Sequence, residues 1–237
     1  MLPTFEEAGN IQPIVRQALA NMPAGSRVLV VDDNSPDGTG EIARRLGDEL
    51  PVEVLRRRGK EGLASAYIAG FKQVLAQGAD LILQMDADFS HDPADLRRLI
   101  EASERADLVL GSRYVPEGGI RDWSFLRRAV SRGGSAYARR VLGIEVRDLT
   151  GGFKCFHREV LESVDLDRIG SQGYAFQVEM TYRALQRGFE VVEIPIVFRD
   201  RQVGKSKMSR AIAFEAAWRV PLLRWREEPT RRHAGCG

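Results

Sequence analysis

The sequence contains little cysteine and no long uncharged hydrophobic run. Its two cysteines, Cys155 and Cys236, lie far apart and show no CxxC or cysteine–histidine spacing. This pattern argues against a disulfide framework, and we expect a protein of the reducing cytoplasm. No stretch reaches the roughly 18 uncharged apolar residues of a membrane-spanning helix. The N-terminus also lacks a basic segment followed by an apolar run, so we predict no signal peptide.

A strong excess of one charge is absent as well. The formal net charge is +2 over 237 residues, so we predict no nucleic-acid partner, and any affinity for phosphates must come from local clusters. The sequence has no GxSxG, P-loop or GxGxxG motif. Its three histidines, His91, His157 and His233, show no metal-ligand spacing, and we assign them no catalytic role. The length suits one large α/β domain or two small ones, and the lack of a linker or repeat favours one.

The first half of the chain alternates short β-branched runs with amphipathic segments. We predict strands at residues 28–31, 52–55, 80–85 and 107–112. We predict helices at residues 40–50 and 61–77, and another that starts with Asp92 as N-cap and Pro93 as first helical residue. This alternation indicates an α/β fold with a mostly parallel sheet. Such sheets bind ligands at the carboxyl ends of their strands.

The second half is less regular. We predict helices at residues 125–142 and 174–187, and a strand at 189–198 that Pro195 interrupts. A short strand follows the turn in DLTGGFKCF. Next comes a basic loop, residues 199–210, which can close over an anionic substrate or lie on anionic lipid. We assign residues 1–210 to the α/β domain and 211–237 to an amphipathic helix with a basic tail. For that helix, packing on the core is favoured over a place at a membrane interface.

The sequence QMDADF places two carboxylates at the end of the predicted strand 80–85. Residues i and i+2 of a strand point the same way, so Asp86 and Asp88 would repel each other unless a cation lay between them. Mg²⁺ commonly binds one or two carboxylates together with phosphate oxygens and waters. The position at the ligand-binding edge favours a metal site over a solvated acidic turn.

Other candidate groups follow the remaining strand ends. Asp32 and Asp33 end the first predicted strand, where a carboxylate can bind a ribose or a base, or cap the turn NSPDGTG. Lys60 stands beside a glycine-rich helix start, which is either an anion site or a solvated basic loop. Four arginines can pair with phosphates or form a solvated helix face: Arg113, Arg127, Arg128 and Arg132.

A series of motifs, in order along nearly the whole chain, resembles family 2 glycosyltransferases of the polyprenol- or dolichyl-phosphate mannose synthase type. The motifs are PTFEE, VVDDNSPDGT, GKEGLASA, QMDADFSHDP, LGSRYV, RRAVSRGGS, DLTGGFKCF and VGKSKM. The resemblance implies a GT-A fold, which is a Rossmann-like, mostly parallel sheet flanked by helices. It implies a GDP-mannose donor, a Mg²⁺ or Mn²⁺ ion and a polyprenyl phosphate acceptor. The expected products are polyprenyl phosphate mannose, formed with inversion, and GDP. The expected place is the cytoplasmic face of a membrane, with peripheral contact made directly or through a membrane-anchored partner.

The resemblance also implies roles for individual residues. The expected nucleotide-sugar site comprises Pro3, Phe5, Glu7, Asp32, Asp33, Lys60, Asp86, Ala87, Asp88, Arg113, Arg199 and Lys205. Within it, Asp86 and Asp88 are the expected metal ligands, and Lys205 belongs to a loop that closes on the donor. The expected catalytic group is Asp88, Arg113, Arg128 and Arg132. The family usually has tyrosine where Phe5 stands, so one hydroxyl contact is missing.

One departure from the family concerns the N-terminus. A β-strand normally precedes the PTFEE-like motif, but only Met1 and Leu2 stand before Pro3. We therefore expect this strand to be missing, with a start codon placed too far downstream as the favoured explanation.

The chemistry of the expected acceptor bears on the mechanism. A phosphate monoester is already largely dianionic at pH 7, because its second pKa is about 6. We therefore expect direct displacement without a dedicated general base, in which the protein positions the oxygen and stabilises the departing GDP. Three alternatives stay open. They are a transferase of the same fold using UDP-glucose or another sugar nucleotide, a non-catalytic subunit that binds nucleotide sugar or lipid phosphate, and a module that binds acidic lipids.

Overall fold

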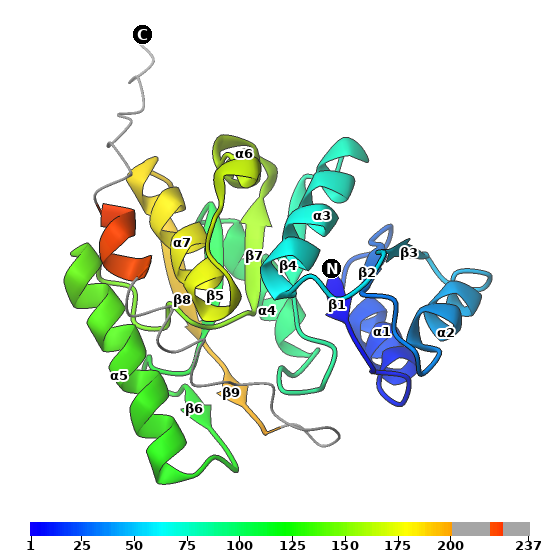
Figure 1. The fold of residues 1–237 in the computed structure, drawn as a ribbon, viewed down its shortest axis with the longest axis horizontal. Helices are drawn as coiled ribbons and strands as arrows, with labels where there is room; N and C mark the ends of the chain where they lie inside the picture. Colours follow the sequence, from blue (N-terminus) through cyan, green and yellow to red (C-terminus); the bar gives the residue numbers. More distant parts are fainter. Residues whose placement is uncertain (201–218, 225–237) are drawn as a thin grey trace, which may run out of the picture.

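The computed structural model describes residues 1–200 and 219–224 (Figure 1). Lys205, most of the predicted basic loop, and most of the predicted C-terminal helix and tail lie outside the described residues. Strands and helices alternate through the first half of the chain, as the hydrophobic pattern predicts.

Where an element was predicted, its bounds agree with the prediction to within a few residues, whereas α1, β6, α6 and η1 were not predicted. The first half comprises β1 (Leu2–Thr4), α1 (Ile11–Ala20), β2 (Val28–Asp32), α2 (Thr39–Leu46), β3 (Val52–Arg56), α3 (Leu63–Ala76), β4 (Leu81–Gln84), α4 (Asp95–Ser103) and β5 (Leu108–Ser112). The second half comprises β6 (Gly119–Ile120), α5 (Phe125–Leu142), β7 (Lys154–His157), α6 (Arg158–Ser163), the 3-10 helix η1 (Leu166–Arg168), α7 (Gly173–Gln186), β8 (Val191–Pro195) and β9 (Val197–Phe198). Pro195 ends β8, so the interruption predicted in this strand is present.

The strands β1, β2 and β3 form a parallel sheet, in which Leu2 lies opposite Val30. The strand β1 has three residues and includes Pro3 and Thr4 of the PTFEE motif. Met1 connects this sheet to β4. Its amino group donates to the carbonyl of Leu83 at 2.7 Å, and its carbonyl accepts from the amide of Met85 at 3.2 Å. Hydrogen bonding thus continues from the first sheet to the second.

The second sheet has the order β4-β7-β5-β8, and β7 runs antiparallel to both of its neighbours. The first residue of β7, Lys154, lies opposite Gln84 and Leu110, near the carboxyl ends of β4 and β5. The chain therefore enters β7 at the edge where parallel strands bind ligands. The turn that precedes β7 is brought to this edge for the same reason.

Helices cover both faces of the sheet (Figure 1). The helices α1, α2 and α4 share one core with β2 and β7, in which Ile14 and Leu99 are fully buried. The helices α3, α6 and α7 share the other core, where Tyr67 stacks on Phe71 at 6.0 Å and on Phe176 at 5.8 Å between ring centroids. The helix α5 lies beyond α7 at the edge of the molecule.

The helix α4 begins later than predicted. Ala94 is its N-cap residue, so the prediction that Asp92 is the N-cap is wrong. The Asp92 carboxylate instead accepts from the amide of Ala94 at 3.0 Å, in the turn before the helix.

Residues 219–224 are helical and pack on the protein. Val220 and Leu223 are buried in the core that also contains α5 and α7. Arg224 donates to the carbonyl of Val141 at 2.8 Å, which attaches this turn to α5. These contacts place the six described residues of the predicted C-terminal helix on the core. Among residues 1–200 and 219–224, no helix is both long and apolar enough to cross a membrane.

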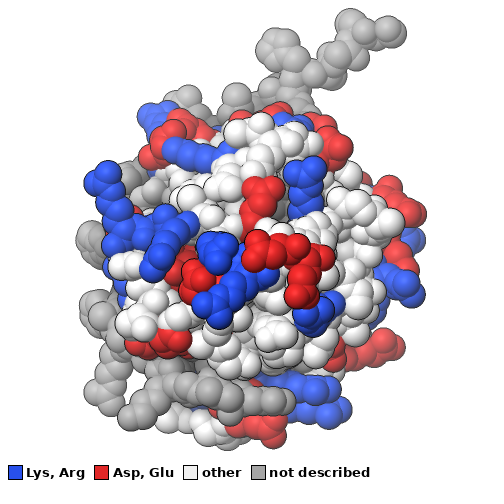
Figure 2. Space-filling model, turned by 90° about the vertical axis from the view of Figure 1, so that its right-hand side faces the viewer, with Lys and Arg blue, Asp and Glu red and all other residues white. Residues whose placement is uncertain are grey.

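The surface over α1 and α2 carries alternating acidic and basic side chains (Figure 2). Ion pairs such as Arg16–Glu49 and Arg45–Glu41 lie there and are exposed. Such pairs contribute little to stability, about 0–1 kcal/mol each.

The turn after β2 brings α2 close to the sheet. Asp32 is fully buried, and its carboxylate accepts from the amide of Ser35 at 3.2 Å and from the hydroxyl of Ser35 at 2.6 Å. Gly38 precedes α2 with a φ of 85°, a conformation that glycine adopts without strain. Gly40 faces the Asp32 carboxylate, and a Cβ atom on Gly40 would lie 2.6 Å from Oδ2 of Asp32.

We therefore expect Gly40→Ala to lower the free energy of unfolding by about 1–3 kcal/mol, because the buried carboxylate has no room to move. Gly133→Ala is the matched control within α5, where a Cβ would meet nothing within 4 Å. It should raise the free energy of unfolding by about 0.5–1 kcal/mol. Urea denaturation of both variants checks the pair, and equal stability of the two would contradict the packing described.

Candidate active site

A cavity of about 450 Å³ opens at the carboxyl ends of the strands. Most of the predicted site residues line it, and these are Pro3, Phe5, Glu7, Asp33, Lys60, Asp86, Ala87, Asp88 and Arg113. They come from the ends of β1, β2, β4 and β5 and from the segment before α3. The structure therefore brings together groups that are far apart in the sequence.

Four predicted site residues lie outside the lining of this cavity. Asp32 is buried beneath the turn after β2 and does not line the cavity. Arg128 and Arg132 are exposed on α5, also outside the lining. Arg199 lines a separate, smaller cavity, although its amide donates to the carbonyl of Ser90 at 3.1 Å. Lys205 lies outside the described residues.

Asp33 contributes a carboxylate to the cavity and is held from behind by Arg57. Arg57 Nη1 donates to Asp33 Oδ1 at 2.6 Å, and each side chain is 8% exposed. Burial raises the pKa of Asp33 above its ordinary value, and the charge of Arg57 opposes this shift. Arg57 also donates to Glu61 at 2.7 Å and to the hydroxyl of Ser65, so its position is fixed. The sequence offered no reason to choose Arg57 from the run of arginines at residues 56–58.

Phe5 and Lys60 lie together on the same side of the cavity. Lys60 Nζ is 4.1 Å from the centre of the Phe5 ring, which is a cation–π contact. An aromatic ring, a lysine and the Asp33 carboxylate offer stacking, positive charge and a hydrogen-bond acceptor. Groups of these kinds can bind a nucleotide.

Asp86 and Asp88 lie in the turn that follows β4 rather than in the strand itself. We predicted that the two side chains point the same way because they lie two positions apart in a strand, and this reason is wrong. Both side chains nevertheless line the same cavity. The Tyr67 hydroxyl donates to Asp86 Oδ1 at 3.2 Å, and Asp88 accepts from the amide of Ser90 at 3.0 Å and from the Ser90 hydroxyl. Phe89 has a φ of 59°, which makes the turn tight.

His91 lines the cavity beneath this turn, which the sequence did not indicate. Its Nδ1 accepts from the amide of Asp86 at 3.4 Å, and its ring stacks on Phe153 at 4.9 Å. Burial lowers the pKa of His91, so the ring is neutral and serves as an acceptor. We therefore interpret His91 as a support for the acidic turn.

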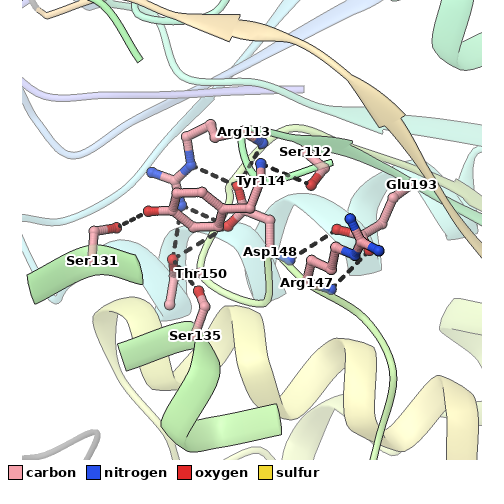
Figure 3. A network of polar contacts seen from close by, with 9 residues as sticks. All are labelled: Ser112, Arg113, Tyr114, Ser131, Ser135, Arg147, Asp148, Thr150 and Glu193. Carbon is pink, nitrogen blue, oxygen red and sulfur yellow. Dashed lines mark hydrogen bonds and ion pairs between the residues drawn. The ribbon is translucent and has the colours of Figure 1, made fainter. Parts of the chain in front are cut away.

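Arg113 and Asp148 form a buried ion pair at the end of β5 (Figure 3). Arg113 Nε donates to Asp148 Oδ2 at 2.6 Å, and Nη2 donates to Oδ1 at 2.7 Å and to the hydroxyl of Thr150 at 2.8 Å. Burial by itself would raise the pKa of Asp148, but the charge and hydrogen bonds of Arg113 lower that pKa below its ordinary value. Asp148 was not among the predicted site residues.

The Arg113–Asp148 pair is connected to two neighbouring elements. The amides of Arg147 and Asp148 each donate to Glu193 of β8 at 2.8 Å. On the other side, the Tyr114 hydroxyl donates to Ser131 of α5 at 2.7 Å (Figure 3). The guanidinium of Arg113 is thus fixed in position at the wall of the cavity.

Trp123, Arg127, Phe198 and Asp200 form a second wall of the cavity. Arg127 stacks on Trp123 with its Cζ 3.9 Å from the ring centre, and its Nη1 donates to Asp200 at 2.9 Å and 3.1 Å. Trp123 packs edge-on against Phe198 with ring centroids 5.3 Å apart. Arg127 was one of four arginines predicted to pair with phosphates, and the structure places it on the cavity wall.

A buried lysine lies behind the site. Lys154 is fully buried, and its Nζ donates to the carbonyl of Gln177 at 2.8 Å and to the hydroxyl of Thr181 at 2.9 Å. The Gln177 side chain lines the cavity and accepts from Gln84 at 2.8 Å. Burial lowers the pKa of Lys154 to about 7, and the charge of Asp148 opposes this shift.

Solved structures with this arrangement of strands and helices identify the fold. The glucosyl-3-phosphoglycerate synthase from Mycobacterium tuberculosis, crystallised with Mn²⁺, UDP and phosphoglyceric acid, matches with a TM-score of 0.71 at 18% identity, over 100% of this chain and 79% of that chain. Because of the low identity, this match shows the fold alone, and the fold is GT-A.

Sequence comparisons identify the family. The family described as "Glycosyl transferase family 2" matches residues 1–165, and this chain belongs to it. A "Polyprenol monophosphomannose synthase" from Mycolicibacterium smegmatis is 44% identical over 93% of this chain and 84% of its own length. An "Undecaprenyl-phosphate mannosyltransferase" from Micrococcus luteus is 45% identical over 95% of this chain and 92% of its own length.

The Arg113–Asp148 pair leads to a prediction about stability. Asp148→Asn leaves the charge of Arg113 buried without its partner and should lower the free energy of unfolding by about 3–5 kcal/mol. Glu162→Gln removes the exposed partner of Arg158 on α6 and should cost less than about 1 kcal/mol. Chemical denaturation at pH 7 compares the two variants. If Asp148→Asn cost no more than the control, the pair would not hold the wall in place.

Lys154 leads to a prediction about pH. The unfolded chain has a lysine pKa near 10.5 and the folded chain one of about 7. The unfolded state therefore binds more protons between these values, and stability rises with pH through this window. Between pH 7 and pH 9, the titration of Lys154 should raise the free energy of unfolding by about 2 kcal/mol. Lys154→Met should lack this rise, and urea unfolding at the two pH values checks it. An equal rise in both proteins would show that Lys154 does not titrate there.

Proposed function

We propose that this protein transfers mannose from GDP-mannose to a polyprenyl phosphate, giving polyprenyl phosphate mannose and GDP with inversion. The observation that carries the proposal is the composition of one cavity. It joins a nucleotide-type site, two nearby carboxylates and a wall that carries the buried Arg113 and the partly exposed Arg127. The two curated relatives, whose names state mannose transfer to polyprenyl phosphates, support the choice of sugar and acceptor.

The donor nucleotide is assigned to the side of the cavity formed by Phe5, Asp33 and Lys60. The Phe5 ring offers a surface for the base, and Lys60 above it offers positive charge to a phosphate. The Asp33 carboxylate, oriented by Arg57, offers an acceptor to the N–H groups of guanine or to ribose hydroxyls. Pro3 and Glu7 complete this side.

The diphosphate and a divalent cation, Mg²⁺ or Mn²⁺, are assigned to Asp86 and Asp88. Among the described residues, no group of three or more acidic, histidine or cysteine side chains could hold a metal. Two carboxylates that line one cavity fit a cation whose remaining ligands are phosphate oxygens and waters. When bound, the cation would neutralise negative charge on the leaving diphosphate.

The protein's own contribution to catalysis is positioning. A dianionic phosphate oxygen needs no deprotonation before it attacks the sugar. His91 is a buried acceptor for the Asp86 amide, which agrees with a mechanism that uses no histidine base. Arg113, fixed by Asp148, can orient phosphate oxygens without reorganising during the reaction.

The acceptor is assigned to the side of the cavity next to α5. The outer face of this helix exposes Phe125 (88%), Leu126 (73%) and Val130 (50%), and it also carries the exposed Arg128 and Arg132. An apolar face flanked by arginines suits a place at a membrane surface, where the hydrocarbon chain of the acceptor resides. We therefore propose peripheral contact with the cytoplasmic face of a membrane through α5, alone or with a membrane-anchored partner.

A transfer assay tests this function. The purified chain is incubated with labelled GDP-mannose, Mg²⁺ and a short polyprenyl phosphate, in parallel with labelled UDP-glucose. We expect labelled lipid from GDP-mannose alone, and none after chelation of the metal. Asp88→Asn should lower the rate by about 100-fold or more, because it weakens the site for the cation.

Asp95→Asn is the matched control for this assay. It removes a carboxylate that pairs with Arg98 on α4, outside the site cavity, and it should leave the rate unchanged. Labelled lipid from UDP-glucose would contradict the assignment of the donor. Nucleotide binding without any lipid product would contradict catalysis and favour a binding subunit.

A further inference from the structure

Tyr67 carries a buried hydroxyl that reaches the acidic turn after β4. The residue belongs to α3 and is fully buried in the core that α3 shares with α6 and α7. Its hydroxyl donates to Oδ1 of Asp86 at 3.2 Å. A buried tyrosine hydroxyl usually has a hydrogen-bond partner, and an ionised carboxylate can only accept. The direction of this hydrogen bond is therefore fixed, from the phenol to the carboxylate.

Other aromatic rings hold the ring of Tyr67 in place. It stacks on Phe71 and lies nearly parallel to Phe176, with an interplanar angle of 5°. Phe71 in turn packs edge-on against Phe156 of β7, with ring centroids 5.5 Å apart. These three neighbours are phenylalanines, and a phenylalanine at position 67 would make the same ring contacts. The feature that distinguishes Tyr67 is the oxygen atom that it directs at Asp86.

Asp86 is restrained from three directions. Its amide donates to Nδ1 of His91 at 3.4 Å, which fixes the backbone. Gly152 lies against the side chain, because a Cβ atom on Gly152 would be 3.6 Å from each carboxylate oxygen. The Tyr67 hydroxyl adds a directed hydrogen bond at Oδ1 and so limits rotation of the carboxylate. The Asp86 side chain is still 29% exposed and lines the cavity, so a bound cation can reach it.

Asp88 is restrained in the same way from within its own turn. Its Oδ1 accepts from the hydroxyl of Ser90. Each of the two carboxylates therefore accepts a hydrogen bond from one hydroxyl at Oδ1. Carboxylates that bind metal ions are usually oriented by such outer partners, and loss of one partner typically lowers metal affinity by about 10–100-fold.

We propose that Tyr67 is a positioning residue for the divalent cation, because its hydroxyl orients the carboxylate of Asp86 that binds the cation. The inference rests on the proposed function, which assigns the cation to Asp86 and Asp88. Tyr67 is not among the residues that line the cavity, so it acts on the cation through Asp86.

The helix α3 is also attached to the nucleotide side of the cavity. The hydroxyl of Ser65 accepts from Arg57, the residue that holds Asp33, and Ala66 lines the cavity. Displacement of α3 would therefore disturb the nucleotide side and the cation side together. Removal of the Tyr67 oxygen alone should disturb only the cation side, and this difference separates a positioning role from a general structural one.

Calorimetric titration of the full chain with GDP tests the inference, once with Mn²⁺ present and once with a chelator. The ratio of the two GDP dissociation constants measures how much the cation adds to GDP affinity. Tyr67→Phe keeps the aromatic contacts and removes the oxygen. We expect the variant to lower this ratio by about tenfold, because Asp86 loses the hydrogen bond that orients it. GDP affinity in the chelator should stay unchanged.

Tyr182→Phe is the matched control. Tyr182 is buried in the same core but is not among the residues that line the cavity, so its loss of a hydroxyl should leave the ratio unchanged. Asp86→Ala supplies a second comparison. Once the carboxylate is absent, the further change Tyr67→Phe should not lower the ratio again, because the two residues act through one contact. Thermal unfolding of each variant confirms that it is folded.

Four outcomes would overturn the inference. Equal ratios in the unchanged protein and Tyr67→Phe would overturn it alone and leave the proposed function standing. An equal loss of GDP affinity with Mn²⁺ and with the chelator would show that the hydroxyl supports the nucleotide side instead. A further fall of the ratio in the double variant would show that Tyr67 acts through a group other than Asp86. If Mn²⁺ added nothing to the GDP affinity of the unchanged protein, the cation assignment of the proposed function would fall together with the inference.

Discussion

The arrangement of the site depends on the buried ion pair between Arg113 and Asp148. Burying two charges costs free energy of hydration, and a bidentate pair recovers it only in a fixed geometry. The pair therefore fixes the end of β5 relative to the turn before β7. Glu193 extends the constraint to β8, and Tyr114 extends it to α5 (Figure 3). Four segments that are distant in the sequence meet at this one contact.

Arginine–carboxylate pairs occur at three places around the cavity. Arg57 pairs with Asp33, Arg113 with Asp148, and Arg127 with Asp200. Each carboxylate holds a guanidinium in place and balances its charge, so the walls present oriented groups with little net charge. A phosphate at such a site is recognised by directed hydrogen bonds rather than by an excess of positive charge. This agrees with a chain whose net charge is only +2.

The fold and half of the site were predictable because their signals are local. Strand ends are visible as apolar runs that stop at acidic residues, and this placed Asp33, Asp86 and Asp88 correctly at one edge. The Arg113–Asp148 pair was not predictable, because its two residues are 35 positions apart and meet only through the antiparallel insertion of β7. The choice of Arg127 over Arg128 was not predictable either. It depends on which side chain in the first turn of α5 faces Trp123, and that side chain is Arg127.

This contrast follows from how the two sides of the cavity are built. The side with Phe5 and Asp33 uses strand ends of the parallel sheet, each of which carries its cavity-lining residues within a few positions. The side with Arg113 and Arg127 uses the turn before an antiparallel strand, the start of α5 and the segment after β9, where the Arg199 amide donates to the carbonyl of Ser90. Displacement of any of these segments would move the arginines relative to the acidic turn. On this side of the cavity, packing rather than local sequence therefore determines which side chains line the site.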